Sequence, residues 1–205
     1  MIEIDNILDV EKYIDNLDVV IFDLDDTLYS EKDYVRSGFN AIAAKYPNVK
    51  NMAQKLWNAF LEGRPAIDYV LEQENLMKER DNCLSIYRKH RPEIHIYDEA
   101  KEVLLRIEKT KRIGIITDGR PEGQKAKIRA LGLDKFVDKI IITDELGSVK
   151  YRKPNPEAFL LMQKTFNCDF SKMCYIGDNI KKDGIAPEKL GMMFIHFKNI
   201  KGLCR

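Results

Sequence analysis

The sequence predicts an α/β protein: a doubly wound, Rossmann-like parallel sheet with an inserted helical cap subdomain. Five short apolar runs, rich in β-branched and aromatic residues and free of polar alternation, are typical of strands covered on both faces of a parallel sheet. Helix-like segments separate the later runs, and strands that alternate with helices form right-handed βαβ units. The five runs are VVIF (19–22), IGIIT (113–117), IIIT (140–143), MCYIG (173–177) and MMFIHF (192–197).

Helical patterns occupy much of the chain around these runs. The amino-terminal residues 3–16 are expected to form a short extra helix. The segment PEGQKAKIRALGL (121–133) has Pro121 near its start and Gly132 near its end, which are the preferred residues at those positions. The segment NPEAFLLMQKTF (155–166) has apolar residues at helical spacing after a proline suited to a first turn.

A long helical interval interrupts this alternation after the first strand. Residues 31–93 contain four helical patterns, SGFNAIAAKY, NMAQKLWNAFLEG, PAIDYVLEQENL and KERDNCLSIYRKH. Because the interval is too long for one crossover, we expect it to form a separate helical cap subdomain. The α/β catalytic core domain would then consist of residues 1–30 and 94–205, which IYDEAKEVLLRIEK (96–109) re-enters as a helix.

The composition argues against several classes of function. Of the 205 residues, 44% are hydrophobic, enough to bury a core. The 34 Lys and Arg nearly balance the 33 Asp and Glu, so no general electrostatic reason favours nucleic acid or a membrane surface as partner. No apolar run approaches the roughly 20 residues of a membrane helix, and the acidic amino terminus does not resemble a secretory signal. The 4 cysteines form no CxxC pair, which suggests reduced thiols in a cytoplasmic protein.

Acidic residues follow two of the predicted strands. Asp23 and Asp25 come directly after VVIF, and Asp178 and Asp183 follow MCYIG. Taken alone, DLDDT is equally consistent with a solvated turn or a helix cap. However, ligands bind at the carboxyl ends of parallel strands, where these carboxylates would repel one another unless a divalent cation neutralised them. All-oxygen ligation suits Mg²⁺, which binds through one or two carboxylates and substrate phosphate.

Two further residues provide groups that suit a phosphate. Thr117 ends the run IGIIT and is followed by DGR, so that a hydroxyl and backbone amides are available to phosphate oxygens. Lys153, in KYRKPNP, supplies a cation. However, Lys150 and Arg152 are close in sequence, and such a run of charged residues is also typical of a solvent-exposed face. The sequence therefore predicts a site for a metal-bound phosphoryl group.

The order of these motifs resembles that of the haloacid dehalogenase-like hydrolase superfamily. DLDDTL is similar to the first motif of that superfamily, IITDG to the second, RKPNP to the third and YIGDNIKKDGIAPEKLGM to the fourth. Together they extend from about Val19 to Met193. The helical interval resembles the four-helix cap of the subfamily that includes phosphoglycolate phosphatase and β-phosphoglucomutase.

The resemblance implies a role for each matching acidic residue. Asp23 is the nucleophile that forms an aspartyl-phosphate. Asp25 is the general acid for the leaving oxygen and then the base for the attacking water. The carboxylates of Asp23 and Asp178 and the backbone carbonyl of Asp25 hold Mg²⁺, while Asp183 orients metal-bound water or Lys153. An acid at position 25 also distinguishes phosphate-ester chemistry from dehalogenation.

The other matching residues are implied to bind the phosphoryl group. Thr117 and the amides of Asp118 and Gly119 hold phosphate oxygens, and Lys153 steadies the nucleophile and the charge on the transferring group. Asp118 stands where the superfamily often has Asn, so its backbone rather than its side chain is expected to act.

The implied activity is Mg²⁺-dependent hydrolysis of a small phosphorylated metabolite by a monomer or homodimer. Two other classes remain open, a phosphomutase of the β-phosphoglucomutase type and a non-catalytic binding protein with the same fold. In the cap, Arg36 and Arg64 are candidates to pair with a second anionic group of the substrate, although most charges in such a cap face water. The cap is expected to open and close over the crevice.

Overall fold

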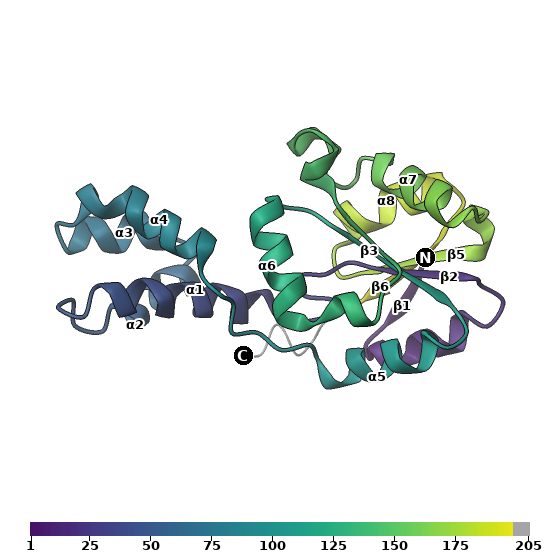
Figure 1. Cartoon of the computed structure of the whole chain (residues 1–205), viewed down its shortest axis with the longest axis horizontal. Coiled ribbons are helices and arrows are strands. Elements are labelled where there is room, and N and C mark those ends of the chain that lie inside the picture. Colours follow the sequence, from purple (N-terminus) through teal and green to yellow (C-terminus); the bar gives the residue numbers. More distant parts are fainter. Residues whose placement is uncertain (199–205) are drawn as a thin grey trace. The chain divides into compact units, whose positions relative to one another are not determined.

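A six-stranded sheet, in which every neighbouring pair is parallel, forms the centre of the core unit, which consists of Met1–Ser30 and His95–Arg205 (Figure 1). The strand order is β1-β6-β5-β2-β3-β4. This confirms the predicted doubly wound α/β fold, and the five apolar runs correspond to β2 to β6. The strands are β1 (Ile2–Ile4), β2 (Val19–Phe22), β3 (Arg112–Thr117), β4 (Lys139–Ile142), β5 (Met173–Gly177) and β6 (Met193–Phe197).

Helices cover both faces of the sheet, with α5 and α7 on opposite sides (Figure 1). Right-handed crossovers require this arrangement, because the chain first adds strands outward from β2 to β4 and then returns to β5. Ile21 of β2 belongs to a buried hydrophobic cluster that includes Phe159 and Met162 of α7, and its neighbours Val20 and Phe22 are also fully buried. The core helices are α5 (Asp98–Ile107), α6 (Pro121–Leu131), α7 (Glu157–Phe166) and α8 (Ile185–Lys189).

Short helical turns make up much of the remaining core unit. The 3₁₀ turns are η1 (Ile7–Tyr13), η3 (Leu133–Lys135), η4 (Thr143–Leu146), η5 (Val149–Tyr151) and η6 (Phe170–Lys172), and η7 (Ile180–Gly184) is a π-helical turn. The expected end of α6 is confirmed, because Gly132 adopts the left-handed conformation, with φ of 63°, directly after the helix.

The prediction of one helix over residues 3–16 is wrong at its start. Ile2–Ile4 form the edge strand β1, which pairs with β6 in the register Ile2 to Ile195. Asn6 then caps the 3₁₀ turn η1, where its side chain accepts a hydrogen bond of 3.0 Å from the Leu8 amide. The strand is missed because its partner lies near the other end of the chain, beyond the reach of any local pattern.

The four helical patterns of residues 31–93 are confirmed as α1 (Glu31–Lys45), α2 (Met52–Leu61), α3 (Ala66–Gln73) and α4 (Arg80–Lys89), with a 3₁₀ turn, η2 (Met77–Glu79), before α4. They enclose a hydrophobic cluster of their own that includes Ile42, Leu56 and Leu71. Gly38 allows α1 to approach α4, because a Cβ at this position would lie 2.5 Å from the Tyr87 ring.

The computed structural model describes residues 1–198. By the density of its contacts the chain divides into two units, Met1–Ser30 with His95–Arg205, and Glu31–Ile94. We refer to these as the core unit and the helical unit. Within residues 1–198, no helix has the length and apolar character required to traverse a bilayer.

Candidate active site

The ends of three adjacent strands bring the predicted site residues of the core unit together. β2 lies between β5 and β3, and Asp23, Asp178 and Thr117 stand at the carboxyl ends of these three strands. From β2 the chain continues to β3 on one side, and it reaches β5 on the other side only later. Ligand crevices in open α/β sheets form at such a switch in strand order.

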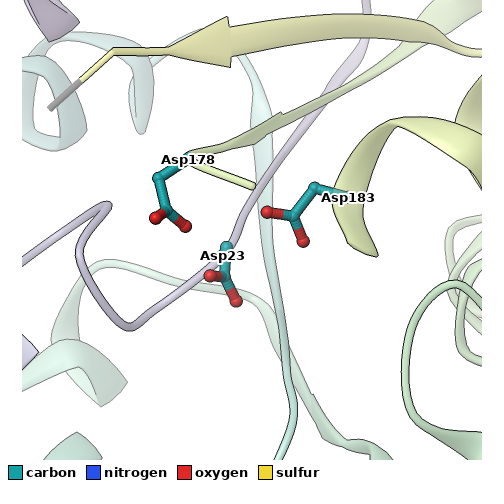
Figure 2. Close-up of side chains that lie close together, drawn as sticks. All are labelled: Asp23, Asp178 and Asp183. Atoms are coloured by element: carbon teal, nitrogen blue, oxygen red, sulfur yellow. The ribbon is translucent and has the colours of Figure 1, made fainter. Parts of the chain in front are cut away.

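Three carboxylates converge at this edge. One oxygen each of Asp23, Asp178 and Asp183 lies within 4.8 Å of the others, and Figure 2 shows the three side chains close together. Asp23 and Asp183 are buried and Asp178 is half-buried. Burial, followed by the charge of Asp183, raises the pKa of Asp178 to about 6. Burial also raises the pKa of Asp23 well above its usual range, despite the nearby ammonium of Lys153. Burial is therefore the main reason that both carboxyl groups bind their protons more tightly than usual.

Lys153 is the residue of the basic segment that reaches the carboxylates. Its Nζ lies 2.6 Å from Asp23 Oδ1 and 2.8 Å from Asp183 Oδ1. Burial alone would lower the pKa of Lys153, but Asp23 and Asp183 outweigh it and hold the pKa above its ordinary value. Arg152 instead forms two hydrogen bonds of 2.7 Å with Asp144. The structure thus distinguishes Lys153 from its basic neighbours in the segment, a distinction that could not be made from the sequence.

Asp183 is positioned by the π-helical turn that follows β5. Its Oδ2 accepts a hydrogen bond of 3.0 Å from the Asn179 amide, and only 1% of the residue is exposed. A Cβ at Gly177 would lie 2.4 Å from the same Oδ2. Glycine at the end of β5 therefore makes room for this carboxylate.

The side chain of Asp25 is held by residues that sequence analysis did not single out. Its Oδ1 lies 2.7 Å from Lys127 Nζ and accepts a hydrogen bond from the hydroxyl of Tyr29. Its Oδ2 accepts a hydrogen bond of 3.0 Å from Gln124 Nε2. Gln124 and Lys127 share a buried face of α6 with the apolar residues Ile128 and Leu131. The only signal available in the sequence was this spacing of two polar residues among apolar ones.

Thr117 and Asp118 are each engaged with other parts of the site. Thr117 is fully buried, and its Oγ1 accepts a hydrogen bond of 2.5 Å from Gln124 Nε2. Asp118 Oδ1 accepts hydrogen bonds from the Thr143 hydroxyl at 2.8 Å and from the Lys153 amide at 3.1 Å. The Asp118 side chain therefore anchors the segment that contains Lys153, a task the sequence did not predict. Gly119 follows with φ of 137°, a conformation that favours glycine.

Two further residues contact the site and were missed in the sequence. The hydroxyl of Tyr175 lies 2.8 Å from Lys153 Nζ and donates to the Ile116 carbonyl at 3.0 Å. Burial, followed by the charge of Asp183, raises the pKa of Tyr175 well above its usual range, so it remains a donor. A polar residue in the otherwise apolar β5 was the available signal. His196 Nε2 lies 3.0 Å from the backbone carbonyl of Asp178, so this histidine has a partner that its spacing did not reveal.

Arg36 and Arg64 both lie in the helical unit, where they stack on aromatic rings. The guanidinium of Arg36 is 4.3 Å from the ring centroid of Trp57, and that of Arg64 is 4.4 Å from the ring centroid of Tyr69. Arg64 also lies 2.7 Å from Glu62. Their predicted contact with substrate stays a prediction.

The sequence of the chain matches the model of a known protein family. The chain belongs to the haloacid dehalogenase-like hydrolases, whose family model matches residues 20–197.

Curated relatives in this family include enzymes named glyceraldehyde 3-phosphate phosphatase. The chain is 38% identical to the one from Pyrococcus abyssi over 100 residues, which cover 48% of this chain and 41% of that protein. This chain thus matches less than half the length of that relative. It is 28% identical to the one from Methanocaldococcus jannaschii over 197 residues, which cover 86% of this chain and 82% of that protein.

Solved structures with the same fold include a subfamily IA hydrolase of the superfamily from Geobacter sulfurreducens. The two chains superpose with a TM-score of 0.70 at 16% identity, and the match covers 89% of this chain and 88% of that one. A second is the hydrolase YfnB from Bacillus subtilis bound to magnesium, with a TM-score of 0.63 and 17% identity, covering 87% and 86%. At these identities, the likeness establishes the fold.

Proposed function

We propose that the protein is a Mg²⁺-dependent phosphatase that hydrolyses a small phosphorylated metabolite through an aspartyl-phosphate on Asp23. The observation that supports this most strongly is the pairing of Asp23 with the buried Lys153, at 2.6 Å, beside two further carboxylates. A nucleophile held next to a fixed cation suits phosphoryl transfer, which requires mainly positioning and the stabilisation of charge.

The residues present fit a magnesium ion. Asp23, Asp178 and Asp183 offer hard oxygen ligands within 4.8 Å of one another, and the backbone carbonyl of Asp25 is a further candidate. The raised pKa of Asp178, about 6, reflects crowded, buried negative charge that a divalent cation would relieve. Bound there, Mg²⁺ would neutralise the carboxylates and polarise phosphoryl oxygens.

The chain's own residues would carry out two displacements. In the first, a carboxylate oxygen of Asp23 bonds to phosphorus while the bond to the leaving oxygen breaks, and Asp25 gives that oxygen its proton. In the second, Asp25 takes a proton from water, whose oxygen bonds to phosphorus as the bond to Asp23 breaks. Thr117 and the amides of Asp118 and Gly119 would hold the phosphoryl oxygens meanwhile.

The helical unit is the proposed source of substrate selectivity, with Arg36 and Arg64 as candidates to recognise a second polar or anionic group. Both guanidiniums are already stacked on aromatic rings, an arrangement that fixes their direction without using all their donors. The names of the curated relatives make glyceraldehyde 3-phosphate a reasonable first substrate to test.

Phosphate release tests this proposal directly. We expect the purified protein to hydrolyse 4-nitrophenyl phosphate and at least one member of a panel of phosphorylated metabolites when Mg²⁺ is present. Chelation by EDTA should lower the rate about 100-fold or more, and added Mg²⁺ should restore it. Absence of turnover in Mg²⁺ would favour a binding protein, whereas weak net release that depends on a bisphosphate primer would favour a phosphomutase.

A further inference from the structure

We propose that Lys127 and Gln124 are positioning residues that aim the carboxyl group of Asp25 at the leaving oxygen of the substrate. The inference rests on the proposed phosphatase activity. It assigns to two residues of α6 the task of holding a catalytic residue in place. Its basis is that these two side chains and Tyr29 together contact both oxygens of Asp25.

The burial of Lys127 distinguishes it from an ordinary surface lysine. Its side chain is 7% exposed, and its Nζ lies 2.7 Å from Asp25 Oδ1. Burying an ammonium group costs free energy because the group loses its hydration. An apolar side chain could be buried at this position at a lower cost. By contrast Lys125, on the same helix, has a half-exposed side chain and pairs with Glu145 at 2.5 Å. Lys127 is thus buried in contact with the carboxylate of Asp25, and this pairing offsets part of the free-energy cost of its burial.

Gln124 connects Asp25 to the proposed phosphate-binding residue. Its Nε2 donates to Asp25 Oδ2 at 3.0 Å and to Thr117 Oγ1 at 2.5 Å. An amide nitrogen has two hydrogens, and these two acceptors use both. The amide group of Gln124 therefore connects Asp25, the proposed proton donor, to Thr117, a proposed phosphate-binding residue. Gln124 is 3% exposed. This arrangement fixes the carboxyl group of Asp25 relative to the side chain of Thr117.

The backbone of the turn that contains Asp25 is held by a hydrogen bond of 3.0 Å from the Leu28 amide to the Leu24 carbonyl. The direction of the Asp25 carboxyl group depends in addition on the side chains that contact it. Asp26, the next residue, adopts the left-handed conformation with φ of 54°. An isolated bridge joins Asp25 to Tyr29 within this turn, and the Tyr29 hydroxyl also donates to the carboxyl group. The other two contacts of the carboxyl group come from α6. Since a misplacement of about 1 Å can cost about 100-fold in rate, loss of these contacts should impair proton transfer.

Proton donation to the leaving oxygen matters most for poor leaving groups. An alkyl phosphate releases a strongly basic alkoxide that must be protonated as the bond to phosphorus breaks. In contrast, 4-nitrophenyl phosphate releases a weakly basic phenolate that needs little help. The value of kcat/KM reports the step in which the leaving group departs, so the ratio of kcat/KM for the two substrates isolates this proton transfer from binding of the phosphoryl group.

We therefore expect Lys127→Met to lower kcat/KM for an alkyl phosphate about 30-fold and to lower it for 4-nitrophenyl phosphate less than about threefold. Lys127→Arg should restore most of the ratio, because a cation again faces Asp25. Lys125→Met is the matched control and should leave both values unchanged. Circular dichroism checks the fold of each variant, and Lys127→Gln is read in the same way if the methionine variant does not fold.

Equal losses on both substrates would overturn the inference, because they would mean that Lys127 only supports packing or charge balance. An unchanged ratio with full activity would also overturn it. Neither result would affect the proposed function, which fails instead if the unaltered protein cleaves neither substrate. Asp25→Asn serves as the reference, since it should show the same selective loss to a larger extent.

Discussion

Asp23→Asn is expected to lower kcat at least about a thousandfold on every substrate, because the amide cannot form the covalent bond to phosphorus. The protein should remain folded. Asn is nearly isosteric, and the change removes one negative charge from a buried group whose pKa burial already raises. Lys153 would keep Asp183 as its partner at 2.8 Å. Steady-state phosphate release and thermal unfolding, measured on the same preparation, check both expectations.

Asp18→Asn is the matched control for this substitution. Asp18 precedes the same strand, β2, at its amino end and is exposed, so the same change of charge should leave kcat within about twofold. Substantial turnover by Asp23→Asn, with phosphate release that follows its concentration, would remove Asp23 from the role of nucleophile.

Lys153→Met is expected to lower kcat about 100-fold or more and to destabilise the metal-free protein. The ammonium would be lost from the position where charge develops during transfer. Asp23 and Asp183, both buried, would be left without their pairing partner, a change that typically costs about 3–5 kcal/mol. Because the pKa of Asp23 lies above its usual range, protonation relieves this cost, so the loss of stability should be larger at alkaline than at acidic pH.

Magnesium provides an independent readout of the same variant. If the carboxylates bind the ion, Mg²⁺ should raise the Tm of Lys153→Met more than that of the unaltered protein. Lys150→Met is the control, because Lys150 is exposed and lies 5.0 Å from the ring of Tyr151 rather than near the carboxylates. Normal kinetics in Lys153→Met, or greater losses in the control, would contradict the role assigned to Lys153.

Much of the fold follows from local patterns in the sequence. The five apolar runs predict strands because residues buried on both faces of a parallel sheet need no polar alternation. The site is predictable for a related reason: parallel strands place the residues that follow them, such as Asp23 and Asp178, at one edge. These inferences need no knowledge of which strands are neighbours.

Features that depend on distant pairing could not be predicted. β1 is a strand because β6, from the other end of the chain, hydrogen-bonds to it. The contact of Asp25 with Lys127 requires α6 to lie against the turn after β2, a relation that no spacing reports. Likewise, Lys153 differs from Lys150 only because the segment after β4, anchored by Asp118, directs one of the two inward.

The central claim, that a carboxylate oxygen of Asp23 becomes bonded to phosphorus, is tested most directly by trapping a mimic of that adduct. Beryllium fluoride forms such mimics with carboxylates, and a crystal structure grown with saturating Mg²⁺ and beryllium fluoride would locate it. We expect beryllium bonded to Asp23, with Lys153 and Thr117 against its fluorides. Beryllium bonded to another residue, or no adduct in protein that hydrolyses phosphate esters under the same conditions, would contradict the account.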